Sequence, residues 1–119
     1  MATIHATLSP DTRSLMDVGR FGLMKPTAYL VNTARGAIVD GATLYAALSS
    51  GQIAGAGLDV FDEEPIPPGH PLTKMSNVVL TSHIGWPTDE MYSQFADEAA
   101  DILLAYRNGK EVPRFVTGH

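Results

Sequence analysis

Three side chains suited to acid–base chemistry and anion binding lie far apart in the sequence: Arg35, Glu64 and His83. A histidine beside a carboxylate is held in one tautomer and can exchange a proton with a substrate oxygen near neutral pH. An arginine can grip a carboxylate with two N–H groups and polarise an adjacent carbonyl. Together they suit reduction of a 2-oxo acid, in which the carbonyl gains negative charge while a cofactor gives hydride.

Each of the three residues also has a purely structural interpretation. Arg35, just before Gly36, could simply cap a loop or form an exposed ion pair, and such pairs are common and weak. Glu64 belongs to an acidic cluster, which in most proteins is a solvated loop. His83 could be a partly buried histidine with its hydrogen bonds satisfied. The catalytic hypothesis therefore depends on whether the three residues meet in space.

Their positions relative to the predicted strands favour such a meeting. Extended segments are predicted at 3–8, 28–31, 53–61 and 77–84. Polar or charged residues come at or just after the ends of the last three segments, and the trio is among them. Ligands of open parallel sheets bind beyond the carboxyl ends of the strands. We therefore expect the trio at one edge of one sheet.

The alternation of strands and helices predicts the fold class. The runs Tyr29-Leu30-Val31 and Val78-Val79-Leu80 are continuously apolar, which is typical of parallel strands covered on both faces. Helices are predicted at 15–24, 40–48 and 89–107. This order favours right-handed crossovers between parallel strands. We expect an α/β fold: a partial Rossmann-like domain with a mainly parallel sheet of about four strands and helices on its faces.

Capping residues and spacing define the helices more closely. Asp40 and Thr88 are expected to cap the second and third helices, and Gly51 to end the second. The third helix carries one apolar stripe, which we expect to pack in the core: Met91, Phe95, Ala99, Ile102 and Tyr106. Residues 62–76 are rich in proline and are predicted to form an irregular loop, which in compact domains is usually functional.

The composition argues against several partners. The chain has 13 acidic and 8 basic residues and no basic cluster, so nucleic acid and anionic membranes are not expected. No apolar run is long enough to span a membrane, and a signal peptide is not expected, so a cytoplasmic location is predicted. There is no cysteine, and the histidines lack the short spacing of metal ligands, so no metal is expected.

Four segments resemble a known family. They are 5–13, 23–40, 55–65 and 77–85, which include LMKPTAYLVNTARGAIVD, GAGLDVFDEEP and NVVLTSHIG. In this order and spacing they closely resemble D-isomer-specific 2-hydroxyacid dehydrogenases, a family of NAD(P)-dependent oxidoreductases of the EC 1.1.1 type. The resemblance implies that residues 1–110 form the C-terminal half of a dinucleotide-binding domain and that 111–119 form a tail toward a substrate domain.

The resemblance also implies roles for single residues. His83 is the general acid for the carbonyl oxygen, Glu64 hydrogen-bonds His83, and Arg35 binds the substrate carboxylate. Asp59 hydrogen-bonds the nicotinamide carboxamide of NAD or NADP. The further residues implied to line the cofactor, beside Arg35 and His83, are His5, Ala6, Thr7, Thr33, Ala34 and Gly85. The substrate is implied to be a small 2-oxo or 2-hydroxy acid.

Two departures from the family pattern matter. Ser82 stands where members usually have proline directly before the histidine. No Gly-x-Gly-x-x-Gly motif is present, so the phosphate-binding loop is missing and the chain is expected to be a fragment of a longer protein. An exposed sheet edge in such a fragment predicts a homodimer or a domain-swapped oligomer. The alternative function is a non-catalytic truncated module, or a cofactor-sensing or assembly protein.

Overall fold

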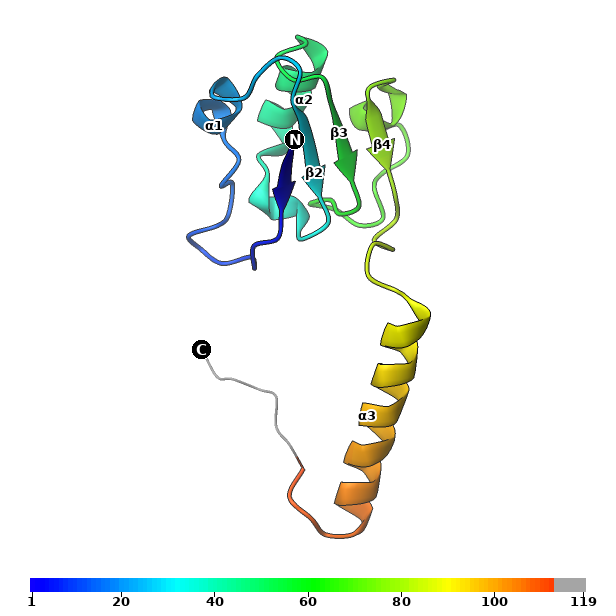
Figure 1. Cartoon of the computed structure of the whole chain (residues 1–119). Helices are drawn as coiled ribbons and strands as arrows, with labels where there is room; N and C mark the ends of the chain where they lie inside the picture. The colour runs from blue at the N-terminus through cyan, green and yellow to red at the C-terminus, as the bar shows by residue number, and fades with distance from the viewer. Residues whose placement is uncertain (113–119) are drawn as a thin grey trace. The chain divides into compact units, whose positions relative to one another are not determined.

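Four parallel strands form the central sheet in the computed structural model, which describes residues 1–112 (Figure 1). The strands are β1 (Ala2–Ile4), β2 (Tyr29–Asn32), β3 (Gly55–Leu58) and β4 (Val78–Leu80). They pair in the sequential order β1-β2-β3-β4, and each of these pairings is parallel. The predicted α/β fold with a four-stranded parallel sheet is confirmed.

Helices connect and follow the strands. They are α1 (Val18–Gly22), the 3-10 helix η1 (Gly36–Ile38), α2 (Gly41–Ser49), the 3-10 helix η2 (Pro71–Lys74) and α3 (Asp89–Arg107). The chain divides into two compact units, one over Met1–Gly85 and one that begins at Trp86. Within the described residues, no helix has the length and apolar character needed to cross a membrane.

Three of the strands, β1, β3 and β4, are shorter than the sequence predicted, and β2 keeps its predicted length but is shifted by one residue. β1 ends at Ile4, because its partner in the register is Asn32, the last residue of β2. The side chain of Asn32 bonds to the Ala34 amide and to the Arg35 carbonyl oxygen in the loop that follows. β3 likewise ends at Leu58, before Asp59, whose carboxylate bonds to a neighbouring loop. Polar side chains at the strand ends thus override the strand propensity of the residues around them.

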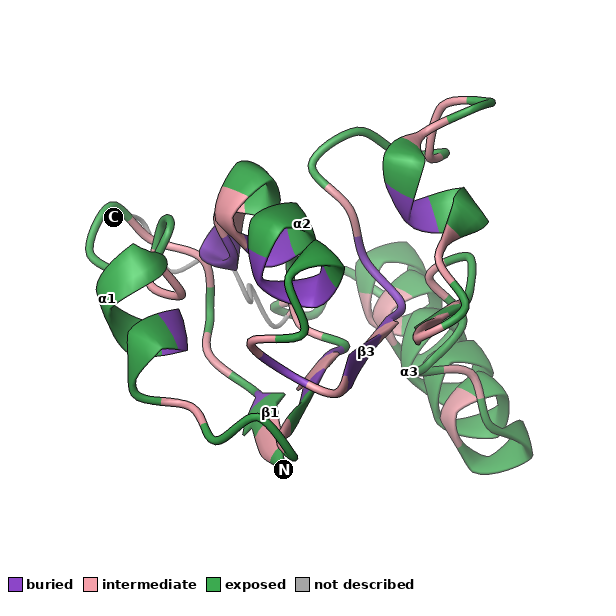
Figure 2. Ribbon diagram, turned by 90° about the horizontal axis from the view of Figure 1, so that it is seen from above, coloured by how far each residue is buried: buried purple, intermediate pink, exposed green. Residues whose placement is uncertain are grey.

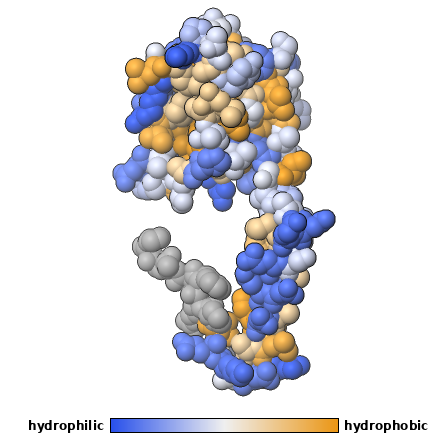
Figure 3. All heavy atoms as spheres, in the orientation of Figure 1, coloured by the Kyte–Doolittle hydropathy of each residue, from blue (hydrophilic) through white to orange (hydrophobic). Residues whose placement is uncertain are grey.

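All the helices of the first unit lie on one face of the sheet. Figure 2 shows α1 and α2 on the same side of the strands. Right-handed crossovers in a sequential strand order place every connection on the same side. Within residues 1–85, the expected flanking helices therefore lie on one face of the sheet. Side chains of the other face are open: Val79 is 68% exposed and Tyr29 is 54% exposed. Figure 3 views this open face, where hydrophobic patches lie among polar ones.

The core lies between the helices and the covered face. Its fully buried apolar residues come from four different segments: Phe21 from α1, Leu30 from β2, Ile38 from η1 and Ile53 before β3. α2 adds Leu44, Ala47 and Leu48. Asp40 caps this helix by accepting a hydrogen bond from the Thr43 amide, as predicted.

The first helix is shorter than its predicted range of 15–24. Asp17 accepts a hydrogen bond from the Arg20 amide and so starts the helix at Val18. Met16 lies outside it because its backbone bridges to Val39 in parallel. Tertiary hydrogen bonds decide this boundary.

The proline-rich segment 62–76 is not wholly irregular. It contains η2, in which Leu72 is buried. The ring nitrogen Nδ1 of His70 accepts a hydrogen bond from the Leu72 amide and caps this turn. The segment therefore contributes a residue to the core as well as a loop to the site.

The last helix matches its predicted range and begins after Thr88, which accepts a hydrogen bond from the Met91 amide. None of its residues is buried in the described chain, so the expectation that its apolar stripe packs in a core is wrong for this chain by itself. Phe95, for example, is 46% exposed and Tyr106 is 78% exposed. Most of the predicted tail 111–119 lies outside the described residues.

Candidate active site

Loops at the carboxyl ends of three strands bring the predicted catalytic residues together. Arg35 follows β2, Glu64 follows β3 and His83 follows β4. All three line one open depression of ≈ 590 Å³, which Arg13 from the segment after β1 also lines. The structure thus unites residues that are separated by almost fifty positions of sequence, while their catalytic roles stay a prediction.

The imidazole of His83 and the carboxylate of Glu64 form a hydrogen-bonded pair. Nδ1 of His83 lies 2.7 Å from Oε2 of Glu64, and because an ionised carboxylate only accepts, Nδ1 carries the proton. The two side chains are 37% and 35% exposed, so solvent and ligands can reach them. Among the described residues, Nε2 of His83 has no hydrogen-bond partner. This geometry leaves one ring nitrogen free for a substrate and holds the other.

Glu64 is itself held in place by the backbone. Its Oε1 accepts a hydrogen bond from the Phe61 amide at 2.9 Å. The pKa of Glu64 lies below its ordinary value. The main cause is the hydrogen bond from His83, and the next is the hydrogen bond from the Phe61 amide. Burial opposes this effect, and the positive charges of His83 and Arg35 add to it. Glu64 is therefore an anion at neutral pH, as a partner of an imidazolium must be.

The loop that carries His83 has an unusual backbone. His83 has a φ of 58°, a left-handed conformation that residues other than glycine seldom adopt. Its amide donates a hydrogen bond to the carbonyl oxygen of Asp59 at 2.8 Å. Such a conformation persists only where surrounding contacts hold it.

Asp59 supplies most of those contacts. It is 4% exposed, and its carboxylate accepts hydrogen bonds from Thr81 Oγ1 at 2.5 Å, from the Ile84 amide at 2.9 Å and from the Gly85 amide at 2.8 Å. Burial raises the pKa of Asp59, but these three hydrogen bonds and the charge of His83 outweigh burial and hold that pKa below its ordinary value. The polar atoms of Asp59 are therefore turned toward the loop 81–85.

A second buried polar residue arranges the loop of Arg35. The side chain of Asn32 is 1% exposed; its Oδ1 accepts from the Ala34 amide and its Nδ2 donates to the Arg35 carbonyl oxygen. A side chain at Gly36 would collide with the backbone of Phe61, so only glycine permits the close approach of these loops. The guanidinium of Arg35 is exposed and donates to the Ala34 carbonyl oxygen at 2.6 Å.

The residues predicted to line a cofactor border a second depression of ≈ 540 Å³. Its lining consists of His5, Ala6, Thr7, Leu8, Thr33, Ala34 and Arg35. Because Arg35 lines both depressions, the two adjoin. Gly85 lies beside them: a side-chain carbon there would be 3.6 Å from Thr33 Cγ2 and 2.9 Å from Asp59 Oδ2. The structure therefore gathers the predicted cofactor residues, and Asp59 alone among them is buried.

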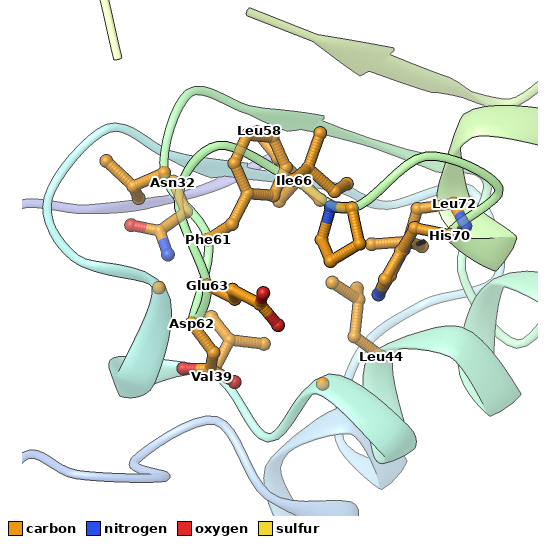
Figure 4. Close-up of a pocket in the computed structure, with 14 residues that line it drawn as sticks. Asn32, Val39, Leu44, Leu58, Phe61, Asp62, Glu63, Ile66, His70 and Leu72 are labelled. Atoms are coloured by element: carbon orange, nitrogen blue, oxygen red, sulfur yellow. Dashed lines mark hydrogen bonds between the residues drawn. The ribbon is translucent and has the colours of Figure 1, made fainter. Parts of the chain in front are cut away.

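Two further hollows flank the site. An apolar one of ≈ 680 Å³ is lined by the His83–Glu64 pair together with Phe61, Ile66 and Ile84, among others. A smaller cavity of ≈ 220 Å³ lies between α2 and the segment 60–72 (Figure 4). Its walls are mostly apolar, and Asp62, Glu63 and His70 also line it. Among the described residues, no cluster of side chains is arranged to hold a metal ion.

Two residues that shape the site were not singled out from the sequence: Asn32 and Thr81. Asn32 ends a strand whose other core-facing residue is Leu30, so a polar residue on a buried face was the available signal. Thr81 follows the apolar run of β4 in the same way. Position at a strand end marks both residues. The partners of Asn32 lie only two and three residues away, whereas Thr81 bonds to Asp59, 22 positions away, which is too far to be inferred from spacing.

A parallel sheet with a hydrogen-bonded His–Glu pair and an arginine at its carboxyl edge is compatible with a domain of the dinucleotide-dependent dehydrogenase class. Residues 1–85 match the family described as D-isomer specific 2-hydroxyacid dehydrogenase, NAD binding domain. The chain belongs to this family, as its sequence motifs indicated. The match ends at Gly85, where the first compact unit also ends.

Known relatives agree with this assignment. The chain is 48% identical over 116 residues to a glyoxylate reductase of Thermofilum pendens, which covers 98% of the chain and 34% of the relative. A D-lactate dehydrogenase with NAD+ from Lactobacillus jensenii is 30% identical with a TM-score of 0.86, over 98% of this chain and 39% of that one.

A D-isomer specific 2-hydroxyacid dehydrogenase from Xanthobacter autotrophicus, solved with NADPH and MES, is 37% identical with a TM-score of 0.78. That likeness covers 97% of this chain and 47% of the other. The chain spans about a third of the length of the curated relatives it matches.

Proposed function

We propose that the chain carries the proton-transfer and carboxylate-binding residues of an NAD(P)-dependent D-2-hydroxyacid dehydrogenase, which acts on a small 2-oxo acid of the glyoxylate type. The observation that carries this proposal is the His83–Glu64 pair, in which Nδ1 is occupied and Nε2 is free. Arg35 lines the same depression and can bind a carboxylate there. The relatives named glyoxylate reductase favour this substrate class.

In the direction of reduction, Nε2 of protonated His83 donates its proton to the carbonyl oxygen of the 2-oxo acid, which becomes a hydroxyl group. Glu64 stabilises the imidazolium through the proton on Nδ1 and keeps the ring in place. Arg35 binds the substrate carboxylate and draws electron density from the adjacent carbonyl. A reduced nicotinamide cofactor, NADH or NADPH, supplies the hydride when it is bound. In the opposite direction neutral His83 takes the proton back.

The residues around the second depression fit one end of such a cofactor. Small side chains, Ala6, Ala34 and Thr33, border it, and it adjoins the depression of His83 through Arg35. Gly85 leaves the space beside Thr33 open, because it has no side chain. A planar ring held there would lie next to the bound acid, as hydride transfer requires.

A chimera tests the proposed function. The 116 matching residues of the Thermofilum pendens glyoxylate reductase are replaced by this chain, and oxidation of NADH and of NADPH is followed with glyoxylate, hydroxypyruvate and pyruvate. We expect oxidation that depends on one of these 2-oxo acids. A chimera that is folded by circular dichroism but inactive with every acid and both cofactors would contradict the proposal.

In an active chimera, Arg35→Lys tests the binding role. Lysine keeps the charge but cannot form the two parallel hydrogen bonds, so KM for the 2-oxo acid should rise by about tenfold or more. The thermal unfolding temperature of the chimera serves as the control, because the Arg35 side chain is exposed and its loss should not change the stability of the fold. An unchanged KM for the acid would remove Arg35 from the proposed role.

The alternative, a non-catalytic or cofactor-sensing module, makes a different prediction for the chain itself. Pyrophosphate contacts from a glycine-rich loop supply much of the affinity for a dinucleotide, so we expect weak or no binding of NADH by the 119 residues alone. Micromolar binding in isothermal titration calorimetry would weaken the alternative of a truncated module.

The predicted homodimer or domain-swapped oligomer is checked by light scattering, and a monomer at high concentration would contradict it.

A further inference from the structure

We propose that Asp59, together with Thr81, is a positioning residue that clamps the loop 81–85 and so sets the direction of His83. Its place in catalysis rests on the proposed function of His83, but the clamp itself does not. The role is distinct from a contact with a nicotinamide, because it is directed at the protein's own backbone.

Both carboxylate oxygens of Asp59 are bonded to the loop. Oδ1 accepts from Thr81 Oγ1 and from the Ile84 amide, and Oδ2 accepts from the Gly85 amide. The donors lie on both sides of His83 in the sequence, so the carboxylate fixes the loop before and after the histidine. A charged acceptor with three donors in a buried place is a strong local anchor.

The backbone of Asp59 completes the clamp. Its carbonyl oxygen accepts from the His83 amide, so one residue binds four donors of the loop. His83 needs such support, because its φ of 58° is costly for a residue with a side chain. Gly85 is part of the same arrangement, since a side-chain carbon there would lie 2.9 Å from Asp59 Oδ2.

The clamp and Glu64 hold the same loop. Asp59 and Glu64 both follow β3, so the loop of His83 is attached at two points of one segment. If the loop moved away from Asp59, Nδ1 of His83 would leave Oε2 of Glu64. Loss of the contact between His83 and Glu64 would therefore show that the hydrogen bonds of Asp59 to the loop have been lost.

The experiment compares three variants of the full 119-residue chain with the wild type by NMR. Asp59→Asn places an amide group against the loop N–H donors. Thr81→Val removes one donor and keeps the charge of Asp59. Glu63→Gln is the matched control, because it removes a carboxylate from the same segment as Asp59, at an exposed position.

The first measurement is amide hydrogen exchange. In Asp59→Asn the amides of Ile84 and Gly85 should exchange about tenfold faster or more, because their hydrogen bonds to the buried carboxylate are lost. Thr81→Val should show a smaller change in the same direction, and Glu63→Gln none. The amide of Ala56, which donates to the Asn77 carbonyl oxygen inside the sheet, should stay protected in all variants and shows that the fold is kept.

The second measurement is the pKa of the Glu64 carboxyl group, followed by its carbon chemical shift. Removing a nearby negative charge lowers the pKa of a carboxyl group, so a pure charge effect of Asp59→Asn or Glu63→Gln would lower it. The clamp predicts the opposite for Asp59→Asn: the contact with His83 weakens and the pKa of Glu64 rises toward its ordinary value. Thr81→Val should raise it without any change of charge.

Fast exchange of the two amides with a rise of the Glu64 pKa would support the clamp. Unchanged exchange in both Asp59→Asn and Thr81→Val, or a Glu64 pKa that falls as in the control, would overturn it. If Asp59→Asn does not fold, Thr81→Val decides alone.

In an active chimera Thr81→Val should lower kcat several-fold with little change in KM for the cofactor. An inactive chimera would remove the proposed function and leave the NMR result standing.

Discussion

The covered face of the sheet and its carboxyl edge are built from different kinds of residue. On the covered face, away from that edge, the buried side chains are apolar, as Leu30, Ala56 and Leu58 show. At the edge are Asn32 and Asp59, the buried polar residues of the described chain, and both direct their hydrogen bonds to loops that carry site residues. The face therefore supplies stability through burial, and the edge decides where the functional side chains point. Substitutions should separate these two contributions.

The largest effect is expected at the edge, on catalysis. His83→Gln in the chimera keeps a polar side chain but cannot donate the proton, so kcat should fall by about 10²–10⁴-fold, which is about 3–5 kcal/mol of activation free energy. Cofactor affinity and the thermal unfolding temperature should stay close to those of the parent chimera. Retention of the parental kcat would show that His83 is not the proton donor.

The next effect is expected on the covered face, on stability. Leu30→Ala leaves a cavity at a fully buried position of a central strand and should lower the free energy of unfolding by about 2–5 kcal/mol. Urea unfolding of the 119-residue chain measures it. A loss well under 1 kcal/mol would mean that the covered face is not the main source of stability.

A smaller effect is expected from acid, at the edge. The pKa values of Asp59 and Glu64 are lower in the folded chain than their ordinary values of 3.8 and 4.5. A lowered folded pKa stabilises the protein above the ordinary value, and that contribution is lost as pH falls through the folded value. Urea unfolding of wild type and Asp59→Asn should therefore differ most near neutral pH and converge below about pH 4. A difference that grows in acid would contradict the assigned ionisation.

The smallest effect is expected on the open face. Val79 lies in β4, but its side chain is 68% exposed, so Val79→Thr should change the free energy of unfolding by no more than about 0.5 kcal/mol. The losses of unfolding free energy in Val79→Thr and in Leu30→Ala, compared with each other, measure the difference between the two faces of one sheet. A large loss would show that a second copy or another segment covers this face in solution, and light scattering of the variant would identify an oligomer.

Much of the fold could be predicted from local sequence. Asp40 and Thr88 were expected as caps and are caps, because a capping side chain bonds to amides only a few residues away. The four strands were found in their order, but the end of β3 was not, because Asp59 bonds to residues 22 to 26 positions away in the sequence. The apolar stripe of α3 was assigned to a core because the spacing of apolar residues shows that a helix has an apolar side. That spacing does not show what covers this side.

The sequence by itself determined the alternation of strands and helices, the family, and the three residue types that are proposed to carry the chemistry. Only the tertiary structure decided that Glu64 contacts Nδ1 of His83, that Asp59 is turned toward the loop 81–85, and that one face of the sheet is open. The physical reason is the range of the interactions. Propensity and capping act within a few residues, whereas a hydrogen bond between Asp59 and Gly85 exists only after β3 and β4 have paired.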